Sequence, residues 1–414
     1  MRTPETGVTS AGLRVVTCPV PGVETVAINL LADTGARFEP APLNGLAHLF
    51  EHMVFKGSER RSAREIAEAI EDVGGQLNAW TSRDATAFHA RLLARDLPLG
   101  LDILADMLVN PRFDEDELAR EKHVVLQELG EARDTPDDIV FDHLQAAAFP
   151  GQALGRSILG SEETLAAITA DDLRGWRDTH YQPERLILSV AGRTAHDEVM
   201  RLAEAALPAR GTPGLALAAE PVGFVAGRHE DNRRCEQAQL TLGLPAPGHH
   251  DAGHDAAVLF VLAVGGGMSS RLFQEVREAR GLAYSVSASV TPYVDGGLMS
   301  VHAACAREDA DAARTLIDEV LAGAVRDLSQ AELDRARAQA VAGLLMALES
   351  PQGQADHVAR CLAIHGRYLA AAEIVARLEA VDVDAARAEG TAMLAHAPAR
   401  AEIGAGKGRR RRSA

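Results

Sequence analysis

The feature that most constrains the fold is a break near the middle of the chain. Between Ala206 and Pro221 the sequence is rich in Pro, Gly and Ala, a composition that favours an exposed connection. The 414 residues exceed the length at which one hydrophobic core keeps growing, so two domains of roughly 200 residues are expected. We predict a first domain at residues 1–207, a linker at 208–221, a second domain at 222–403 and a disordered basic tail at 404–414.

Hydrophobic patterns on both sides of this break mix the period of strands with that of helices. The strands predicted in the first half are residues 14–17, 26–32 and 186–191, with a pair inside 76–93. The helices predicted there are residues 45–56, 63–73, 97–108, 115–133, 139–148 and 170–179. The second half repeats the order weakly, with strands near 223–225, 238–243, 284–290 and 298–305, a helix at 255–264, and helices to the end. This mixture predicts an α+β fold class, in which two related domains each have a mostly antiparallel sheet with helices packed on one face.

One short motif carries the chemistry. His48 and His52 stand four residues apart, with Glu51 directly before the second histidine. On a helix, positions i and i+4 share a face, so both imidazoles can bind one ion while the glutamate lies in the same arc. Two imidazoles are suitable zinc ligands, and a carboxylate beside them can take a proton from water. The order inverts the commoner His-Glu-x-x-His motif, and the alternative is a pair of core histidines on an amphipathic helix.

A third ligand has to come from elsewhere, since catalytic zinc usually has three protein ligands and one open position. The acid-rich helix predicted at 115–133 offers Glu121, His123, Glu128 and Glu131. Glu128 stands among apolar residues, and a carboxylate buried there needs a partner. Spacing does not choose among the four, and solvation at the surface is the alternative for each.

Charge and composition exclude several other classes of protein. Acidic residues outnumber basic ones by 59 to 42, and the net charge is −17, which makes nucleic acid an unsuitable partner for the folded body. The four cysteines are far apart and form no Cys-x-x-Cys pair, so neither a disulfide framework nor a thiolate zinc site is expected. No apolar run approaches the roughly 18 to 20 residues of a membrane span, and the first residues lack the pattern of a secretory signal. We therefore expect a cytoplasmic protein that binds no membrane.

The chain resembles the pitrilysin/insulinase family of zinc peptidases, in particular the branch of mitochondrial processing peptidase and its bacterial relatives. The matching stretches are His48 to Gly57, Gly74 to Ala79, Thr81, Asp84, Arg120 to Glu128, Asp134 to Asp138, Leu154 to Arg156, Ile158, Gly160, and Gly265 to Tyr284. The resemblance implies a clamshell of two homologous domains and a Zn²⁺ cofactor. It also implies that Glu128, which stands 76 positions after His52, is the third ligand and that Glu121 supports the site.

The same resemblance assigns residues that hold the substrate. Asn78 and Ala79 match an edge strand to which an extended peptide adds its backbone. Arg277 and Tyr284 match an arginine and a tyrosine that reach the substrate and suit the stabilisation of a developing oxyanion. An ordinary strand after a glycine turn is the alternative for Asn78 and Ala79.

These residues together predict a zinc-dependent metalloendopeptidase that hydrolyses peptides or unfolded segments bound in extended form. The catalytic residues would be Glu51, Tyr284 and Arg277, and the metal ligands His48, His52 and Glu128. The expected partners are the substrate and a second subunit, in a homodimer or in a heterodimer with a homologous chain. The alternative is a non-catalytic or obligate-heterodimer subunit of a complex that resembles processing peptidase.

Overall fold

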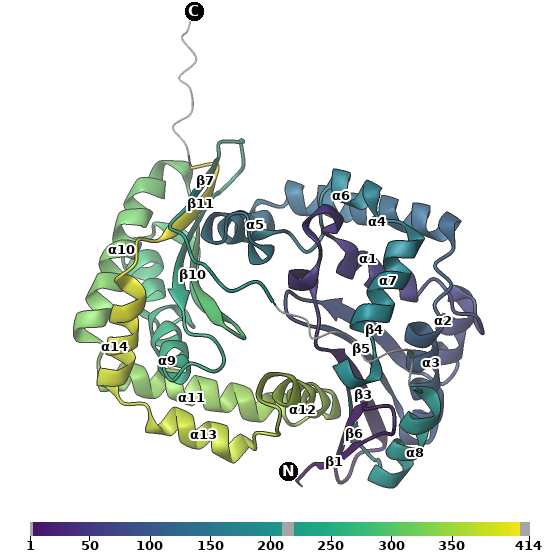
Figure 1. Cartoon of the computed structure of the whole chain (residues 1–414). Helices are drawn as coiled ribbons and strands as arrows, with labels where there is room; N and C mark the ends of the chain where they lie inside the picture. Colours follow the sequence, from purple (N-terminus) through teal and green to yellow (C-terminus); the bar gives the residue numbers. More distant parts are fainter. Residues whose placement is uncertain (1–2, 209–218, 406–414) are drawn as a thin grey trace, which may run out of the picture. The chain divides into compact units, whose positions relative to one another are not determined.

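The computed structural model describes residues 3–208 and 219–405, and Figure 1 shows its helices and strands. Most of the predicted linker at 208–221 and of the predicted tail at 404–414 lies outside these residues. The described part contains two sheets, each with helices packed against it.

The first sheet has six strands in the order β1-β2-β6-β3-β5-β4. The strands are β1 (Glu5–Val8), β2 (Arg14–Pro19), β3 (Thr25–Ala32), β4 (Gln76–Thr81), β5 (Thr86–Leu93) and β6 (Leu186–Gly192). Only the β2–β6 pair is parallel, and the other neighbours are antiparallel. In the β4–β5 hairpin Gln76 lies opposite Arg91 and Thr81 opposite Thr86. Because β4 is the last strand in the order, no strand within residues 3–208 and 219–405 pairs with its outer edge.

The second sheet has five strands in the order β7-β11-β8-β10-β9. They are β7 (Arg228–Asp231), β8 (Ala238–Ala246), β9 (Ala283–Tyr293), β10 (Gly296–Cys305) and β11 (Ala399–Ile403). The β7–β11 pair is parallel and the other three pairs are antiparallel. Both sheets are therefore mostly antiparallel, as predicted.

The helices of the first half are α1 (Leu46–Val54), α2 (Ala63–Glu71), α3 (Leu97–Val109), α4 (Glu115–Asp134), α5 (Pro136–Ala148), α6 (Glu162–Ala167), α7 (Ala170–His180) and α8 (His196–Ala206). Those of the second half are α9 (His254–Gly265), α10 (Ala310–Asp327), α11 (Gln330–Ala347), α12 (Pro351–His365), α13 (Ala371–Ala380) and α14 (Val383–Leu394), with a short π-helix at Phe273–Ala279. Helices and strands alternate in clusters, so the predicted α+β fold class is confirmed.

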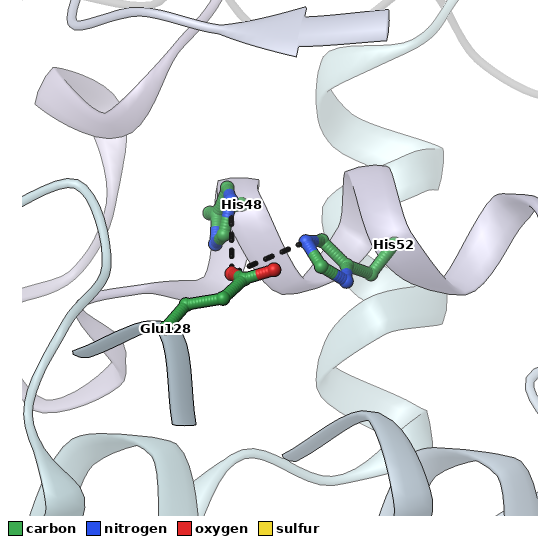
Figure 2. A group of neighbouring side chains, drawn as sticks. All are labelled: His48, His52 and Glu128. Carbon is green, nitrogen blue, oxygen red and sulfur yellow. Dashed lines mark ion pairs between the residues drawn. The ribbon is translucent and has the colours of Figure 1, made fainter. Parts of the chain in front are cut away.

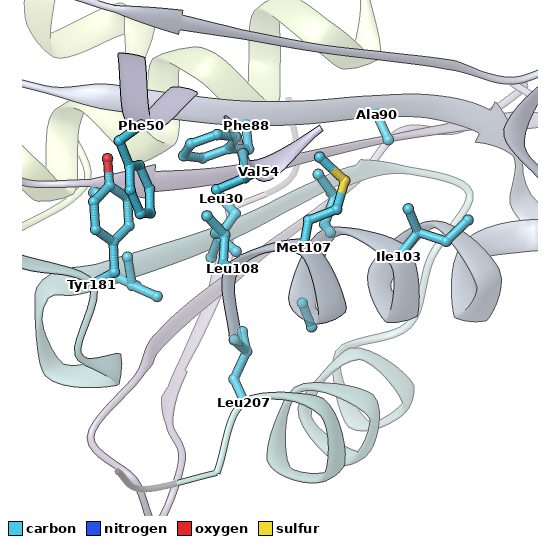
Figure 3. Close-up of a cluster of buried hydrophobic side chains, with 14 of the residues drawn as sticks. Leu30, Phe50, Val54, Phe88, Ala90, Ile103, Met107, Leu108, Tyr181 and Leu207 are labelled. Carbon is cyan, nitrogen blue, oxygen red and sulfur yellow. The ribbon is translucent and has the colours of Figure 1, made fainter. Parts of the chain in front are cut away.

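The core that carries α1 lies on one face of the first sheet. Phe50 and Val54 of α1 pack there with Phe88 of β5 and with Met107 and Leu108 of α3 (Figure 3). All five side chains are buried. Phe50 also stacks on the ring of Tyr181, with ring centroids 4.4 Å apart. The apolar side of α1 is therefore fixed against the sheet, which leaves its polar side for the motif.

Each sheet is also covered on its other face by a helix from the opposite half of the sequence. The chain divides into two compact units, one of Met1–Leu129, Ser157–Glu220 and Leu344–Ala370 and the other of Gly130–Arg156, Pro221–Gly343 and Ala371–Ala414. In the first unit, α12 packs on β2, β3 and β6 through Ala355, Val358, Ala359 and Leu362. In the second unit, α5 packs on β7, β8 and β11. The two halves thus exchange one helix each, whereas the predicted domains are continuous in sequence.

Two local expectations for the second half were wrong. Residues 223–225 form no strand. In chain order the first strand of the second sheet is β7, which starts at Arg228, five residues after Gly223. The end of the chain is not helical throughout, because β11 follows α14 and occupies the position between β7 and β8. β11 has only five residues and lies between two other strands. Its sequence is therefore a short buried run, and no turn signal beside it marks it as a strand.

No helix within residues 3–208 and 219–405 combines the length and the apolar character needed to cross a bilayer.

Candidate metal centre

The motif lies on α1, whose local sequence separates an apolar side from a polar one. Leu46, Leu49, Phe50 and Met53 are fully or almost fully buried, while His48 and His52 are partly exposed. The two imidazole rings lie edge to face, with centroids 4.6 Å apart. Four residues of helix therefore place both rings on one side, as the spacing predicts.

A buried carboxylate fixes the start of α1. The carboxylate of Glu39 accepts hydrogen bonds from the backbone N–H groups of Gly45 (2.9 Å) and Ala47 (2.7 Å) and from the side-chain amide of Asn44 (2.8 Å). Gly45 has a positive φ of 96°, and a β-carbon there would lie 3.0 Å from the carbonyl oxygen of Leu159. Helix α1 begins at Leu46, one residue after the start of the helix predicted at 45–56, and its first N–H groups are capped by Glu39 from outside the helix.

Glu39→Ala is expected to lower the free energy of unfolding by about 2–4 kcal/mol, because buried N–H groups at the start of α1 would lose their acceptor. Urea unfolding of the variant and of Glu59→Ala, which removes an exposed carboxylate, measures the difference. Equal stability of the two variants would contradict a capping role for Glu39.

Glu128 of α4 brings a carboxylate to the two histidines (Figure 2). Its Oε2 lies 3.6 Å from His52 Nε2 and 3.9 Å from His48 Nε2. The three ligand atoms all lie within 4.8 Å of one another, and no other group of three or more His, Cys, Asp or Glu side chains in the described chain meets this condition. Ligands of a tetrahedral zinc ion lie about 3.4 Å apart, so small side-chain rotations would bring these atoms to bonding positions.

The protonation of His48 suits such a site. Burial and, to a smaller extent, the neighbouring His52 lower the pKa of His48 to about 4. The imidazole is therefore neutral at pH 7 and keeps a lone pair for a cation. Two imidazoles and one carboxylate form a donor set that fits Zn²⁺.

A second acid of α4 holds His52 in place. Glu121 is buried, and its Oε2 lies 3.1 Å from His52 Nδ1 while its Oε1 lies 2.8 Å from Lys56 Nζ. A carboxylate on the far ring nitrogen fixes the orientation and tautomer of a metal-binding histidine. Lys56 compensates the charge of the buried carboxylate.

Glu51 faces a different neighbour. Its Oε2 accepts a hydrogen bond of 2.5 Å from the hydroxyl of Thr81, at the end of β4. Burial raises the pKa of Glu51, and the charge of Glu128 adds to this, while the Thr81 hydrogen bond and His52 act in the opposite direction. The carboxylate is therefore beside the His-His-Glu cluster without belonging to it.

Of the four residues of α4 that spacing left open, the structure groups only Glu128 with both histidines. Glu121 contacts His52 from the other side of its ring. His123 is exposed and lies 3.3 Å from Gln127, and Glu131 is also exposed. Glu121 and Glu128 therefore lie on the side of α4 that faces α1, as expected for positions two turns apart.

The residues assigned to the substrate lie in two places. Asn78 and Ala79 are on the edge strand β4, where the side-chain Oδ1 of Asn78 accepts the backbone N–H of Ala79 at 2.9 Å. Arg277 and Tyr284 belong to the second unit. The guanidinium of Arg277 lies 5.5 Å from the ring centroid of Tyr284, whose side chain is 71% exposed. Their part in a reaction stays a prediction.

Three contributors to the site were missed in the sequence. Glu39 gives no local signal, because it caps a helix across an intervening loop. Thr81 was noted only as part of a matching stretch, although it ends a strand on the same sheet edge as Asn78. Lys56 stands four residues after His52, so helical spacing could have placed it near the same acid.

The fold and the cluster together define the class, which is a two-unit α+β protein with a His-His-Glu group held between two helices. A family model described as insulinase (peptidase family M16) matches residues 14–162, and one described as the peptidase M16 inactive domain matches residues 167–340. The chain belongs to peptidase family M16, the insulinase family. The expected family is confirmed.

Similar proteins are known from several bacteria. The chain is 37% identical over 377 residues to the uncharacterized zinc protease YmxG of Bacillus subtilis, which covers 90% of this chain and 91% of the relative. It is 36% identical over 406 residues to an uncharacterized zinc protease of Streptomyces coelicolor, which covers 95% and 88%. A crystal structure of a protease from Helicobacter pylori has a TM-score of 0.90 at 20% identity and covers 97% of this chain and 99% of that one. The structural similarity supports the fold.

Proposed function

We propose that the chain is a zinc-dependent endopeptidase that cleaves peptides or unfolded segments bound in extended form. The convergence of His48, His52 and Glu128 next to the partly buried carboxylate of Glu51 carries this proposal. Membership of peptidase family M16 and the naming of relatives as zinc proteases support it.

His48, His52 and Glu128 would hold the ion, with Glu121 orienting His52. A bound Zn²⁺ ion lowers the pKa of a water molecule and polarises a carbonyl group. Glu51 then accepts the proton of the attacking water and delivers a proton to the leaving amine.

The substrate would add its backbone to the open edge of β4. In the structure the side-chain oxygen of Asn78 accepts a hydrogen bond from the backbone N–H of Ala79. An incoming peptide carbonyl would replace this oxygen as the acceptor. Such main-chain pairing demands little of the substrate sequence. Arg277 and Tyr284 would contribute from the second unit, through the guanidinium and the exposed phenol.

Digestion of an unstructured peptide by the purified chain tests the proposal. We expect cleavage that a chelator abolishes and that stoichiometric Zn²⁺ restores. Activity that needs a second, homologous protein would favour the obligate heterodimer, whereas chelator-insensitive cleavage would contradict a metal mechanism. Sizing of the active species distinguishes a homodimer from a monomer.

Glu128→Gln is expected to lower the zinc content of the purified protein well below that of the wild type, because an amide oxygen is a weaker ligand than a carboxylate. Loss of a ligand from a three-ligand site weakens affinity by at least the roughly 10–100-fold that is typical for the loss of a supporting residue. Glu131→Gln, an exposed position on the same helix, is the matched control and should retain the metal. Unchanged zinc in both variants would assign the third ligand to another residue.

A further inference from the structure

The hydroxyl of Thr81 makes a short contact with the carboxylate assigned as the base. Thr81 Oγ1 donates to Glu51 Oε2 at 2.5 Å, and both side chains are partly buried. Thr81 is the last residue of β4 and pairs with Thr86 across the hairpin, so its backbone is fixed by the sheet. A hydrogen bond to one carboxylate oxygen leaves the other oxygen to exchange a proton.

The turn that follows Thr81 is anchored to the segment that caps α1. The backbone N–H of Ala36 donates to the carbonyl of Ser82 (3.0 Å), and that of Arg37 donates to the carbonyl of Arg83 (2.9 Å). The fit is close, since a β-carbon on Gly35 would lie 2.3 Å from the carbonyl oxygen of Ser82. Arg37 is itself buried and lies 3.3 Å from Asp84.

The same short segment continues to Glu39, whose carboxylate holds the first turn of α1. Residues 35–39 therefore connect two structures, the end of β4 that carries Thr81 and the helix that carries Glu51. This connection constrains the positions of the two backbone segments that carry the Thr81 hydroxyl and the Glu51 carboxylate.

We propose that Thr81 is a positioning residue that orients the carboxylate of Glu51 and keeps it in register with a peptide bound along β4. The inference rests on the proposed function, because it assigns Thr81 a role through Glu51. Asn78 and Ala79 lie on the same strand, three and two residues before Thr81, so a substrate paired with β4 is placed relative to the base by one rigid strand. Positioning of this kind affects turnover strongly, since a displacement of about 1 Å can cost on the order of 10²-fold in rate.

Thr81→Val tests the proposal, because valine keeps the shape of threonine and replaces only the hydroxyl with a methyl group. We expect kcat per bound zinc to fall by roughly 10–100-fold, with KM within about twofold of the wild type and zinc content unchanged. Thr81→Ser, which keeps a hydroxyl, should recover most of the loss. A purely structural role would not divide the effect in this way between kcat and KM.

A matched control is Thr241→Val in the second unit, where a buried threonine hydroxyl donates to the carbonyl of Ala401 at 2.8 Å. This variant should lose stability and keep kcat per bound zinc. If Thr81→Val does not fold, Thr81→Ala is judged by the same criterion.

Glu51→Gln, measured in parallel, distinguishes failure of the positioning role of Thr81 from failure of the proposed peptidase function. A wild-type kcat per zinc in the Thr81 variants, together with an inactive Glu51→Gln enzyme, would overturn the positioning role alone. A fully active Glu51→Gln enzyme would overturn the proposed function and the positioning role with it.

Discussion

Glu51→Gln is expected to lower kcat by about 10²–10⁴-fold and to leave the zinc content of the protein unchanged. Glutamine has nearly the same shape but cannot accept a proton from water, and Glu51 is not one of the three residues whose ligand atoms converge. Peptide cleavage and metal analysis on the same preparation measure both quantities. Activity and metal binding should therefore separate in this variant.

Glu71→Gln is a suitable control, since it makes the same change at an exposed position of α2. It should match the wild type in both measurements. Near-normal cleavage by Glu51→Gln would remove the base assignment, while loss of zinc would show that Glu51 helps to hold the ion.

A fragment of residues 1–207 is expected not to fold as a cooperative unit, although it contains every predicted metal ligand. It lacks α12, so Val16, Ala27, Leu31 and other buried residues of one sheet face would be exposed to water. An exposed apolar face of this kind favours aggregation. The fragment also retains α5 without the sheet on which that helix packs. Solubility and urea unfolding followed by circular dichroism provide the measurement.

A matched fusion protein joins residues 344–370 to the same fragment through a flexible linker. It should recover a cooperative transition and bind zinc, because α12 again covers β2, β3 and β6. Val358→Asp in that fusion should abolish the recovery, since it places a charge in the contact, whereas Arg360→Asp on the exposed side of α12 should not. Cooperative unfolding of residues 1–207 alone would instead support a domain that is continuous in sequence.

Elements with strong local patterns could be predicted closely. The helix expected at 63–73 is α2 at Ala63–Glu71, where Ser62 and Glu65 form a capping box. The hairpin expected within 76–93 is β4 and β5. The short strands β7 and β11 could not be placed in the same way, because their position depends on pairing between distant segments.

The candidate site likewise contains residues that local spacing predicts and residues that only tertiary packing identifies. His48, Glu51 and His52 follow from helical spacing within five residues, but the spacing of α4 admitted four possible third ligands. The packing of α4 beside α1 places Glu128 in the cluster with both histidines and places Glu121 against Nδ1 of His52.

By itself, the sequence determined the α+β class and the helix with its two histidines, because hydrophobic period and residue spacing are local properties that the backbone reproduces directly. The family followed from the resemblance of its motif stretches. Only the tertiary structure decided that Glu39 caps this helix, that Thr81 contacts Glu51 and that the two halves exchange α5 and α12. These contacts join residues from 6 to more than 300 positions apart, as in the bond between Asn29 and Asp356. Such distances are closed by burial of apolar surface over the whole unit, which no short stretch of sequence encodes.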